Sequence, residues 1–320
     1  MSLADLAARL RAALGVKGKR DIQAAARRLG PARGEPLAPG DDCAVIPDGE
    51  GHLLLAAEGM WPRFVESDPY FAGYSAIMVN VADVHAMGGR PVAVVDVLWG
   101  TSGAALEPIW DGMLAAARVY GVPIVGGHTS ARSPYDAIAV AILGRAVRLL
   151  RSAAARPGDA LLLAVDLRGR MHPEYLYWDA STGADPARLR ADLEILPALA
   201  ESGRCDAAKD VSMGGVVGTA LMMLEAAGAG AVLEIDAVPR PDGVPLERWL
   251  LAFPSYGFLL SVRPEQERAV IAAFEERELA CARVGVVDAS RRLALRAGGE
   301  EALLWDLQAE PLTGFGGGAP

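Results

Sequence analysis

The chain has few of the residues that build a disulfide framework or a zinc site. Its 320 residues include three cysteines, Cys43, Cys205 and Cys281, with no CxxC pair, and four histidines with no HxxxH pair. An odd set of widely spaced cysteines argues against a disulfide scaffold and against a thiolate zinc site. The histidine spacing likewise does not fit a zinc hydrolase. We therefore expect three buried, reduced thiols.

Long apolar runs and basic clusters are also missing. No segment approaches the roughly 18 to 20 consecutive apolar residues that cross a bilayer. The N-terminus "MSLADLAARLRAALGVKGKR" has an amphipathic pattern with an acidic residue, which is unlike a signal peptide. The 31 basic residues are dispersed and are outnumbered by 40 acidic ones, which argues against nucleic acid as a partner. We expect a cytoplasmic protein that binds neither membrane nor nucleic acid.

The common fingerprints of catalysis and nucleotide binding are not present in the sequence. It contains no P-loop, no GxGxxG after a predicted strand and no nucleophile elbow. What the chain does have is an acidic surplus, with a net charge of −9. Magnesium is bound by one or two protein carboxylates together with phosphate oxygens, so the placement of Asp and Glu residues becomes the informative feature.

The order of predicted elements divides the chain into two similar halves of the α+β class. We predict an N-terminal helical segment over residues 1–37, a first domain over 38–150, a second domain over 151–310 and a flexible tail over 311–320. Periodicity and turn residues predict helices over 69–87, 106–120, 186–202 and 212–227, and strands over 52–60, 91–99 and 281–288. A further short strand, "VPIVGG", is expected to end in a glycine turn.

The stretch "NVADVHAMGGRP" places Asp83 and His85 in a helix that is apolar nearly all round. An ionised carboxylate there is costly unless a cation or several donors neutralise it. Asp83 could pair with an arginine or cap a turn, but we favour a metal ion as its partner. For His85 we favour a core histidine bonded to the backbone.

Two further acidic segments are candidates for the same chemistry. In "PGDDCAVIP", Asp41 and Asp42 precede an apolar strand, so they are either an Asx-type turn or metal ligands. Glu58 stands at the end of an apolar strand, where it is either solvated or directed into a cleft.

Two glycine-containing segments are candidates for phosphate binding. In "VGGHTS", Gly126 and Gly127 would let backbone amides approach a phosphate, or they form a simple turn. In "KDVSMGGVVG", glycines in the first helical turn would present amides to an anion, or they allow close helix packing. Lys209 at the start of this segment supplies a cation suited to a phosphate.

Taken in order, these segments resemble the aminoimidazole ribonucleotide (AIR) synthetase superfamily, also called PurM-like, which includes thiamine-monophosphate kinase and selenophosphate synthase. The resemblance covers roughly residues 38–290. It is carried by "GDDCAVI", "NVADVHAMGGRPVAVV", "GGHTS", "RSAAARPGD" and "DVSMGGVVGTALMMLEAAGAGA".

The resemblance implies two α+β domains, a homodimer formed through the sheet of the first, and ATP with Mg²⁺ bound by the chain. It implies metal ligands at Asp41, Asp42, Glu58, Asp83 and Asp210, with Asp83, Lys209 and Asp210 acting in catalysis. It implies nucleotide contacts at Gly126, Gly127, His128, Thr129, Arg151, Ser212 and Gly214.

Differences from the characterised members place the chain nearest the AIR synthase-related branch. Selenophosphate synthases carry a reactive Cys followed by Lys in an N-terminal loop, whereas this chain has Lys17 and Lys19 but no cysteine before Cys43. Thiamine-monophosphate kinases carry Asp where this chain has His128, and an Asp-Gly pair where it has Met213 and Gly214. We expect an ATP- and Mg²⁺-dependent phosphotransferase or ligase acting on a small molecule. The alternative is a nucleotide-binding scaffold or regulatory subunit.

Overall fold

The chain folds into two compact units whose composition does not follow the linear order of the sequence. The computed structural model describes residues 2–30 and 39–316. Unit 1 combines Met1–Asp41, Leu149–Thr182 and Ala198–Pro320, and unit 2 combines Asp42–Arg148 and Gly183–Pro197. The N-terminal helical segment thus belongs with the C-terminal part of the chain. The short segment Gly183–Pro197, which follows a part of unit 1 in the sequence, belongs to unit 2.

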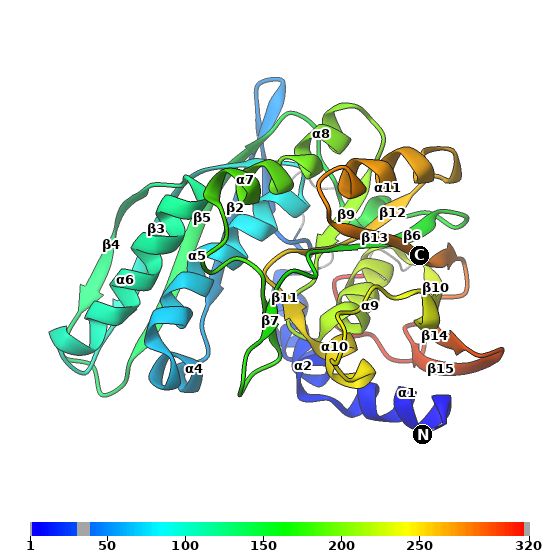
Figure 1. The fold of residues 1–320 in the computed structure, drawn as a ribbon, viewed down its shortest axis with the longest axis horizontal. Helices are drawn as coiled ribbons and strands as arrows, with labels where there is room; N and C mark the ends of the chain where they lie inside the picture. The colour runs from blue at the N-terminus through cyan, green and yellow to red at the C-terminus, as the bar shows by residue number, and fades with distance from the viewer. Residues whose placement is uncertain (1, 31–38, 317–320) are drawn as a thin grey trace. The chain divides into compact units, whose positions relative to one another are not determined.

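Unit 2 is built on a five-stranded sheet with the strand order β1-β2-β5-β3-β4. All neighbouring strands are antiparallel except β3 and β4, which are parallel. Figure 1 shows α5 and α6 on the same face of this sheet. Its elements are β1 (Ala44–Asp48), β2 (Gly51–Gly59), α4 (Pro62–Ser67), α5 (Pro69–Ala86), β3 (Arg90–Trp99), α6 (Gly103–Tyr120), β4 (Ile124–Ser130), β5 (Ala137–Ala146) and α7 (Pro186–Leu193); α8 (Ile195–Glu201) crosses the unit boundary.

Helix α5 begins and ends where the sequence indicates. The Asp68 side chain accepts a hydrogen bond from the Phe71 amide, and Pro69 occupies the first helical position, where its missing N–H costs nothing. The helix ends at Ala86, and Gly88 follows with φ of 77°. Most of its side chains are buried on every side. A polar group on α5 is therefore largely removed from solvent.

Unit 1 contains a seven-stranded sheet, ordered β15-β14-β10-β13-β6-β12-β9, and a three-stranded sheet, ordered β11-β8-β7. Its helices are α1 (Leu3–Ala12), α2 (Leu14–Lys17), α3 (Gln23–Leu29), α9 (Gly215–Ala227), α10 (Leu246–Leu251) and α11 (Glu267–Glu275), with 3₁₀ turns η1 (Gly18–Ile22), η2 (Ser152–Ala154), η3 (Ile235–Ala237) and η4 (Pro264–Gln266). Its strands are β6 (Ala160–Val165), β7 (Arg170–Met171), β8 (Tyr177–Asp179), β9 (Ala207–Asp210), β10 (Gly230–Glu234), β11 (Phe253–Pro254), β12 (Gly257–Val262), β13 (Ala280–Asp288), β14 (Arg292–Ala297) and β15 (Glu300–Asp306).

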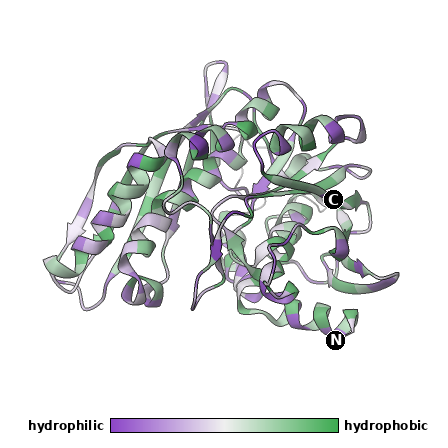
Figure 2. Cartoon of the chain, viewed as in Figure 1, coloured by the Kyte–Doolittle hydropathy of each residue, from purple (hydrophilic) through white to green (hydrophobic). Residues whose placement is uncertain are grey.

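The core of unit 1 forms around strands that are buried on both faces. Every residue of β6, β9 and β12 is buried, which explains why β6 is a continuous apolar run rather than an alternating one. Helix α9 packs into the same core through residues such as Val217 and Leu221. Figure 2 shows α9 largely in hydrophobic colours, in contrast to the polar patches of α7.

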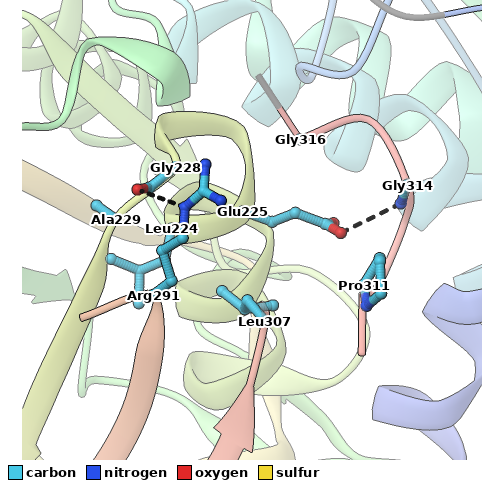
Figure 3. A pocket seen from close by; sticks show the side chains of 9 residues that line it. All are labelled: Leu224, Glu225, Gly228, Ala229, Arg291, Leu307, Pro311, Gly314 and Gly316. Atoms are coloured by element: carbon cyan, nitrogen blue, oxygen red, sulfur yellow. Dashed lines mark hydrogen bonds between the residues drawn. The ribbon is translucent and has the colours of Figure 1, made fainter. Parts of the chain in front are cut away.

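Residues 312–314 are held in unit 1 by the buried carboxylate of Glu225 on α9. That carboxylate accepts hydrogen bonds from the amides of Leu312, Thr313 and Gly314 and from the Thr313 hydroxyl. Figure 3 shows Glu225 directed toward Gly314 across a pocket. The expected flexible tail from residue 311 therefore does not fit residues 312–314, because their backbone amides donate to a buried acceptor. Residues 317–320 lie outside the described part of the chain.

The state of the three cysteines and the length of the helices can be compared with what the sequence predicts. Cys43, Cys205 and Cys281 are buried and are not joined in disulfides. Burial raises the pKa of Cys205 and of Cys281 to about 12, so both thiols are protonated and unreactive at neutral pH. Within residues 2–30 and 39–316, no helix combines the length and the apolar character needed to cross a bilayer.

Candidate functional site

Two carboxylates of unit 2 lie close together. A side-chain oxygen of Asp42 and one of Asp83 are within 4.8 Å of each other. Asp83 comes from the last turns of α5 and is 6 % exposed, while Asp42 is half-buried just before β1. Like charges at this spacing in a buried setting oppose each other's ionisation unless a cation lies between them. The pair therefore offers oxygen ligands of the kind that a divalent ion prefers, and a bound divalent ion would compensate the two negative charges.

His85 is a structural residue of the same helix. Its Nδ1 donates to the Val81 carbonyl oxygen at 2.8 Å, and the side chain is buried. Burial lowers the pKa of His85 to about 4, so the ring is neutral at physiological pH. This agrees with the core role that we favoured for it.

Asp41 belongs to unit 1 and has different partners from its neighbour. Its carboxylate accepts hydrogen bonds from the Ser152 amide at 2.9 Å and the Ser152 hydroxyl at 2.7 Å. The Nζ of Lys209 lies 4.0 Å from Asp41 Oδ1, and both side chains are largely buried. This arrangement holds the Lys209 Nζ near the end of β9, beside the Asp41 carboxylate.

The segment after β9 places Asp210, Ser212 and Gly214 at the entry to α9. Asp210 is buried, and its backbone oxygen accepts a hydrogen bond from the Thr219 hydroxyl. Lys19 donates to the Ser212 hydroxyl at 3.1 Å. The N-terminal segment of the chain thus reaches the start of α9 within unit 1.

The first turn of α9 differs from the predicted one. We predicted a helix from Ser212, but it begins at Gly215 with Gly214 as its N-cap. Gly214 has φ of 99°, in the left-handed region, which cannot continue a right-handed helix. A Cβ on Gly15 would lie 2.9 Å from the Gly214 nitrogen, so the two backbones are in close contact. Close packing accounts for at least part of this glycine pattern.

The glycines of "VGGHTS" do not form the turn that we predicted. They lie inside β4, which runs through to Ser130 and pairs in parallel with β3, with Gly126 opposite Val95 and Gly127 opposite Asp96. A Cβ on Gly127 would come within 2.6 Å of the Asp96 carboxylate, whereas one on Gly126 would meet open space. Gly127 therefore makes room for Asp96, and the backbone pairing with β3 keeps the segment extended.

Asp96 is a buried carboxylate that our interpretation of the sequence did not select. It is 2 % exposed and shares the helix-facing side of β3 with Val94 and Leu98. Neither of its carboxylate oxygens has a hydrogen-bond partner in the described part of the chain. Burial raises the pKa of Asp96. The alternation of "PVAVVDVLW" could have revealed it, since residues 94, 96 and 98 fall on one face.

Neutralising Asp96 is expected to stabilise the protein. A raised folded-state pKa means that the folded protein binds this proton more tightly than the unfolded chain does. The wild type therefore loses stability as the pH rises from 3.8, the ordinary Asp pKa, through the folded value. The Asp96→Asn variant has no such loss, so its free energy of unfolding should exceed that of the wild type by an amount that grows over this pH interval to about 1 kcal/mol. Urea unfolding of both proteins at several pH values measures the difference; a variant that is less stable at neutral pH would contradict it.

The two halves of the chain match two family models. Residues 40–146 match the AIR synthase related protein N-terminal domain, and residues 156–298 match the C-terminal domain of the same family. Together these matches cover most of the chain. The chain belongs to the AIR synthase-related family.

Its relatives in this family include proteins of several kinds. An uncharacterized protein from Synechocystis is 50% identical over 320 residues, covering 98% of this chain and 99% of that protein. A selenide, water dikinase from Geobacter metallireducens is 31% identical over 223 residues, covering 64% of this chain and 62% of that enzyme. The match to phosphoribosylformylglycinamidine synthase subunit PurL of Methanosarcina acetivorans covers 89% of this chain but only 43% of that subunit.

Solved structures of the PurM-like superfamily have the same fold. Thermotoga maritima PurL complexed with ADP superposes with a TM-score of 0.70 at 21% identity, covering 86% of this chain and 46% of PurL. This chain therefore spans about half the length of that protein. AaThiL complexed with AMPPCP and TMP gives a TM-score of 0.67 at 19% identity, covering 89% of this chain and 96% of AaThiL. At these identities the likeness shows the two-domain α+β architecture.

Other predicted site residues of this AIR synthase-related chain are spread over both units. In unit 2, Glu58 is exposed at the end of β2, and His128 and Thr129 are exposed on β4. In unit 1, Arg151 is exposed and its amide donates to the Asp206 carbonyl oxygen. Their roles stay predictions. Ser152, which holds Asp41, was not singled out from the sequence because a serine in a polar crossing gives no local signal.

Proposed function

We propose that this AIR synthase-related protein is an ATP- and Mg²⁺-dependent enzyme that transfers a phosphoryl group to an oxygen atom of a small molecule. The observation that carries the proposal is the pair of carboxylates, Asp42 and Asp83, within 4.8 Å of each other in unit 2. Support also comes from relatives such as the selenide, water dikinase and from fold neighbours solved with ADP, ATP and AMPPCP.

The carboxylates fit magnesium by chemistry and by burial. Mg²⁺ takes oxygen ligands and is typically held by one or two carboxylates plus phosphate oxygens. Asp83 is 6 % exposed on a helix whose side chains are mostly buried, so an ionised carboxylate there is costly unless nearby groups or a cation compensate its charge. We assign Asp42 and Asp83 as ligands, and Asp210 and Glu58 as further ligands on the basis of their motifs. Bound magnesium would neutralise phosphate charge.

Lys209 supplies the cation that a phosphoryl transfer needs from the protein. Its ammonium group is held at 4.0 Å from Asp41, which is itself oriented by Ser152. A cation fixed before substrate binds needs no reorganisation during the reaction. We assign Asp41 to positioning Lys209 rather than to direct metal binding.

The remaining nucleotide contacts follow from the motifs. We assign Gly126, Gly127, His128 and Thr129 on β4, together with Arg151, Ser212 and Gly214 in unit 1, to binding the nucleotide. Backbone amides at glycines can approach phosphates closely because no Cβ intervenes. The open space beside Gly126 is compatible with such an approach. The Lys19 contact with Ser212 brings a second cation to the same segment of unit 1.

A second candidate function is a nucleotide-binding scaffold or regulatory subunit without turnover. It is favoured by His128, exposed on β4, and by Met213, 43 % exposed before α9. These positions hold carboxylates in the thiamine-monophosphate kinases that the chain resembles. Loss of ligands there would weaken catalysis more than binding.

The experiment that tests the proposal measures ADP formation from ATP with small acceptors that carry carboxylate, amide or phosphate groups. Reactions with Mg²⁺ are compared with reactions containing EDTA, and nucleotide binding is measured in parallel by calorimetry. The proposal predicts Mg²⁺-dependent ADP formation that one acceptor class stimulates. Tight Mg·ATP binding without ADP formation under any acceptor would favour the scaffold. No binding of Mg·ATP would refute both functions.

We further propose that the protein forms a homodimer through the sheet of unit 2. One face of this sheet packs against α5, while the opposite face exposes apolar side chains such as Leu55, Val92 and Val95, each more than 40 % exposed. Apolar side chains gathered on a sheet face favour association. The superfamily resemblance implies the same interface.

Placing a charge on this face should prevent dimerisation. In a symmetric dimer the Val95→Asp variant would bury two unpaired carboxylates, raising the dimer dissociation constant by roughly 100-fold or more. Light scattering after size-exclusion chromatography measures the mass. Val147→Asp is the matched control, because Val147 is 61 % exposed and outside the strands of the sheet. A monomeric wild type, or a dimeric Val95→Asp variant, would contradict the interface.

A further inference from the structure

A pocket of unit 2 lies between α6 and the edge of the sheet. It has a volume of about 330 Å³, which is at the small end of the range for ligand sites. The edge strand β4 forms one side, and α6 forms the other. Its lining residues are Asp96, Trp110, Leu114, Ile124, Gly126, Gly127 and Thr129.

The pocket contains a buried carboxylate. Asp96 is 2 % exposed, and within residues 2–30 and 39–316 its two carboxylate oxygens have no hydrogen-bond partner. Leaving two buried acceptors unsatisfied costs free energy that an apolar residue at this position would not cost. The Gly127 position, where any side chain would strike Asp96, keeps the carboxylate next to the pocket. Such a group is suited to receive N–H donors from a ligand.

The other walls favour a flat, largely apolar ligand. Trp110 and Leu114 come from α6 and Ile124 from β4, so an aromatic ring and two aliphatic side chains surround the carboxylate. A planar heterocycle with N–H donors on its edge matches this combination, because its faces contact apolar groups while its edge meets the acceptors. Gly126 and Gly127 also line the pocket, and both belong to the proposed nucleotide contacts.

We propose that this pocket binds the amino-purine base of the nucleotide, with Asp96 accepting a hydrogen bond from the exocyclic amino group. The inference rests on the proposed nucleotide-dependent function and names Asp96 as the residue that determines base specificity. An ionised Asp96 offers two acceptors, which suits the adjacent N–H groups of guanine. A protonated Asp96 offers one donor and one acceptor, which suits the ring nitrogen and amino group of adenine. Because burial raises the pKa of Asp96, protonating it costs less than protonating an exposed aspartate, which makes the adenine arrangement accessible.

The test compares the affinities of ATP, GTP and purine riboside triphosphate, which lacks the amino group, by calorimetry with Mg²⁺. The wild type should bind ATP at least about tenfold more tightly than the analogue without the amino group, the equivalent of one satisfied buried hydrogen bond. In the Asp96→Leu variant this ratio should fall to about one. Asp111→Asn on α6, the helix that lines the pocket, should keep the wild-type ratio, because Asp111 is exposed.

The outcomes separate this inference from the proposed function. Equal wild-type affinity for ATP and the analogue lacking the amino group overturns the base assignment while leaving nucleotide binding intact. If the wild type binds none of the three nucleotides, the base assignment and the proposed function both fail. Tighter binding of GTP than ATP keeps the amino-purine assignment and identifies guanine as the base. The ratio of the wild-type affinities for ATP and for the analogue without the amino group tests the base assignment even if the Asp96→Leu variant does not fold.

Discussion

The Asp83→Asn variant is expected to bind Mg²⁺ at least roughly 100-fold more weakly than the wild type. Removing a residue that only hydrogen-bonds to a metal ligand already lowers metal affinity by about 10- to 100-fold, and removing the ligand itself should cost at least the upper value. It is also expected to lose Mg²⁺-dependent ADP formation. A side-chain oxygen of Asp42 lies within 4.8 Å of one of Asp83, so the variant leaves only one carboxylate of this pair. Titration with Mn²⁺, followed by electron paramagnetic resonance, measures the affinity directly.

Stability measurements separate this loss from misfolding. Without metal, Asp83→Asn should be at least as stable as the wild type, since it removes a buried negative charge that lies next to the half-buried carboxylate of Asp42. Added Mg²⁺ should raise the melting temperature of the wild type but not of the variant. Asp68→Asn is the matched control on α5, because an asparagine can still accept the Phe71 amide hydrogen bond. Full retention of Mg²⁺ binding in Asp83→Asn would remove Asp83 from the metal site.

The Glu225→Ala variant is expected to be destabilised by roughly 3 kcal/mol, through the loss of a buried acceptor. Three backbone amides and one hydroxyl of residues 312–314 donate to this carboxylate, and all would be left without it. The C-terminal segment would then detach from α9 and become accessible to proteases. Urea unfolding gives the free energy, and limited proteolysis with mass spectrometry shows where cleavage begins.

Two comparisons sharpen this test. Glu276→Ala removes an exposed glutamate near the end of α11 and should change stability by less than about 0.5 kcal/mol. A chain ending at residue 310 should be destabilised to a similar degree as Glu225→Ala, and adding Glu225→Ala to it should cost little more, because the donors are already gone. Additive losses in the double change would show that Glu225 stabilises unit 1 independently of the C-terminal segment.

The parts of the fold that local chemistry specifies were predictable from the sequence. Asp68 and Pro69 mark the start of α5, and Gly121, in the left-handed conformation, closes α6. The predicted helix over 69–87 and the predicted strand over 91–99 agree with α5 and β3 to within one residue. Capping residues and alternating burial act over a few neighbours, so a single sequence displays them.

The errors arise where distant contacts or backbone details decide the structure. The predicted helix over 186–202 is divided into α7 and α8 near Glu194, because Pro197 has no amide to continue the hydrogen-bond pattern. Strands β14 and β15 were not predicted at all, since their alternation is interrupted by charged residues and a bulge between Leu293 and Ala294. The assignment of residues 183–197 to unit 2 depends on tertiary packing that no local pattern shows.

The candidate site was predictable only in part for the same reason. Asp83 could be selected because a carboxylate on an apolar helix is unusual whatever its neighbours are. The different partners of Asp41 and Asp42 could not, because they depend on Ser152 and Lys209, far along the chain. Asp96 was overlooked inside an apolar strand, although its helix-facing position makes it the most unusual residue of β3.

The most direct test of the proposed metal site is a crystal structure of the protein with Mg²⁺ and a non-hydrolysable ATP analogue. The proposal predicts a magnesium ion with oxygen atoms of both Asp42 and Asp83 at about 2.0–2.1 Å, and phosphate oxygens completing its coordination. A bound nucleotide whose magnesium ions contact neither Asp42 nor Asp83 would contradict it.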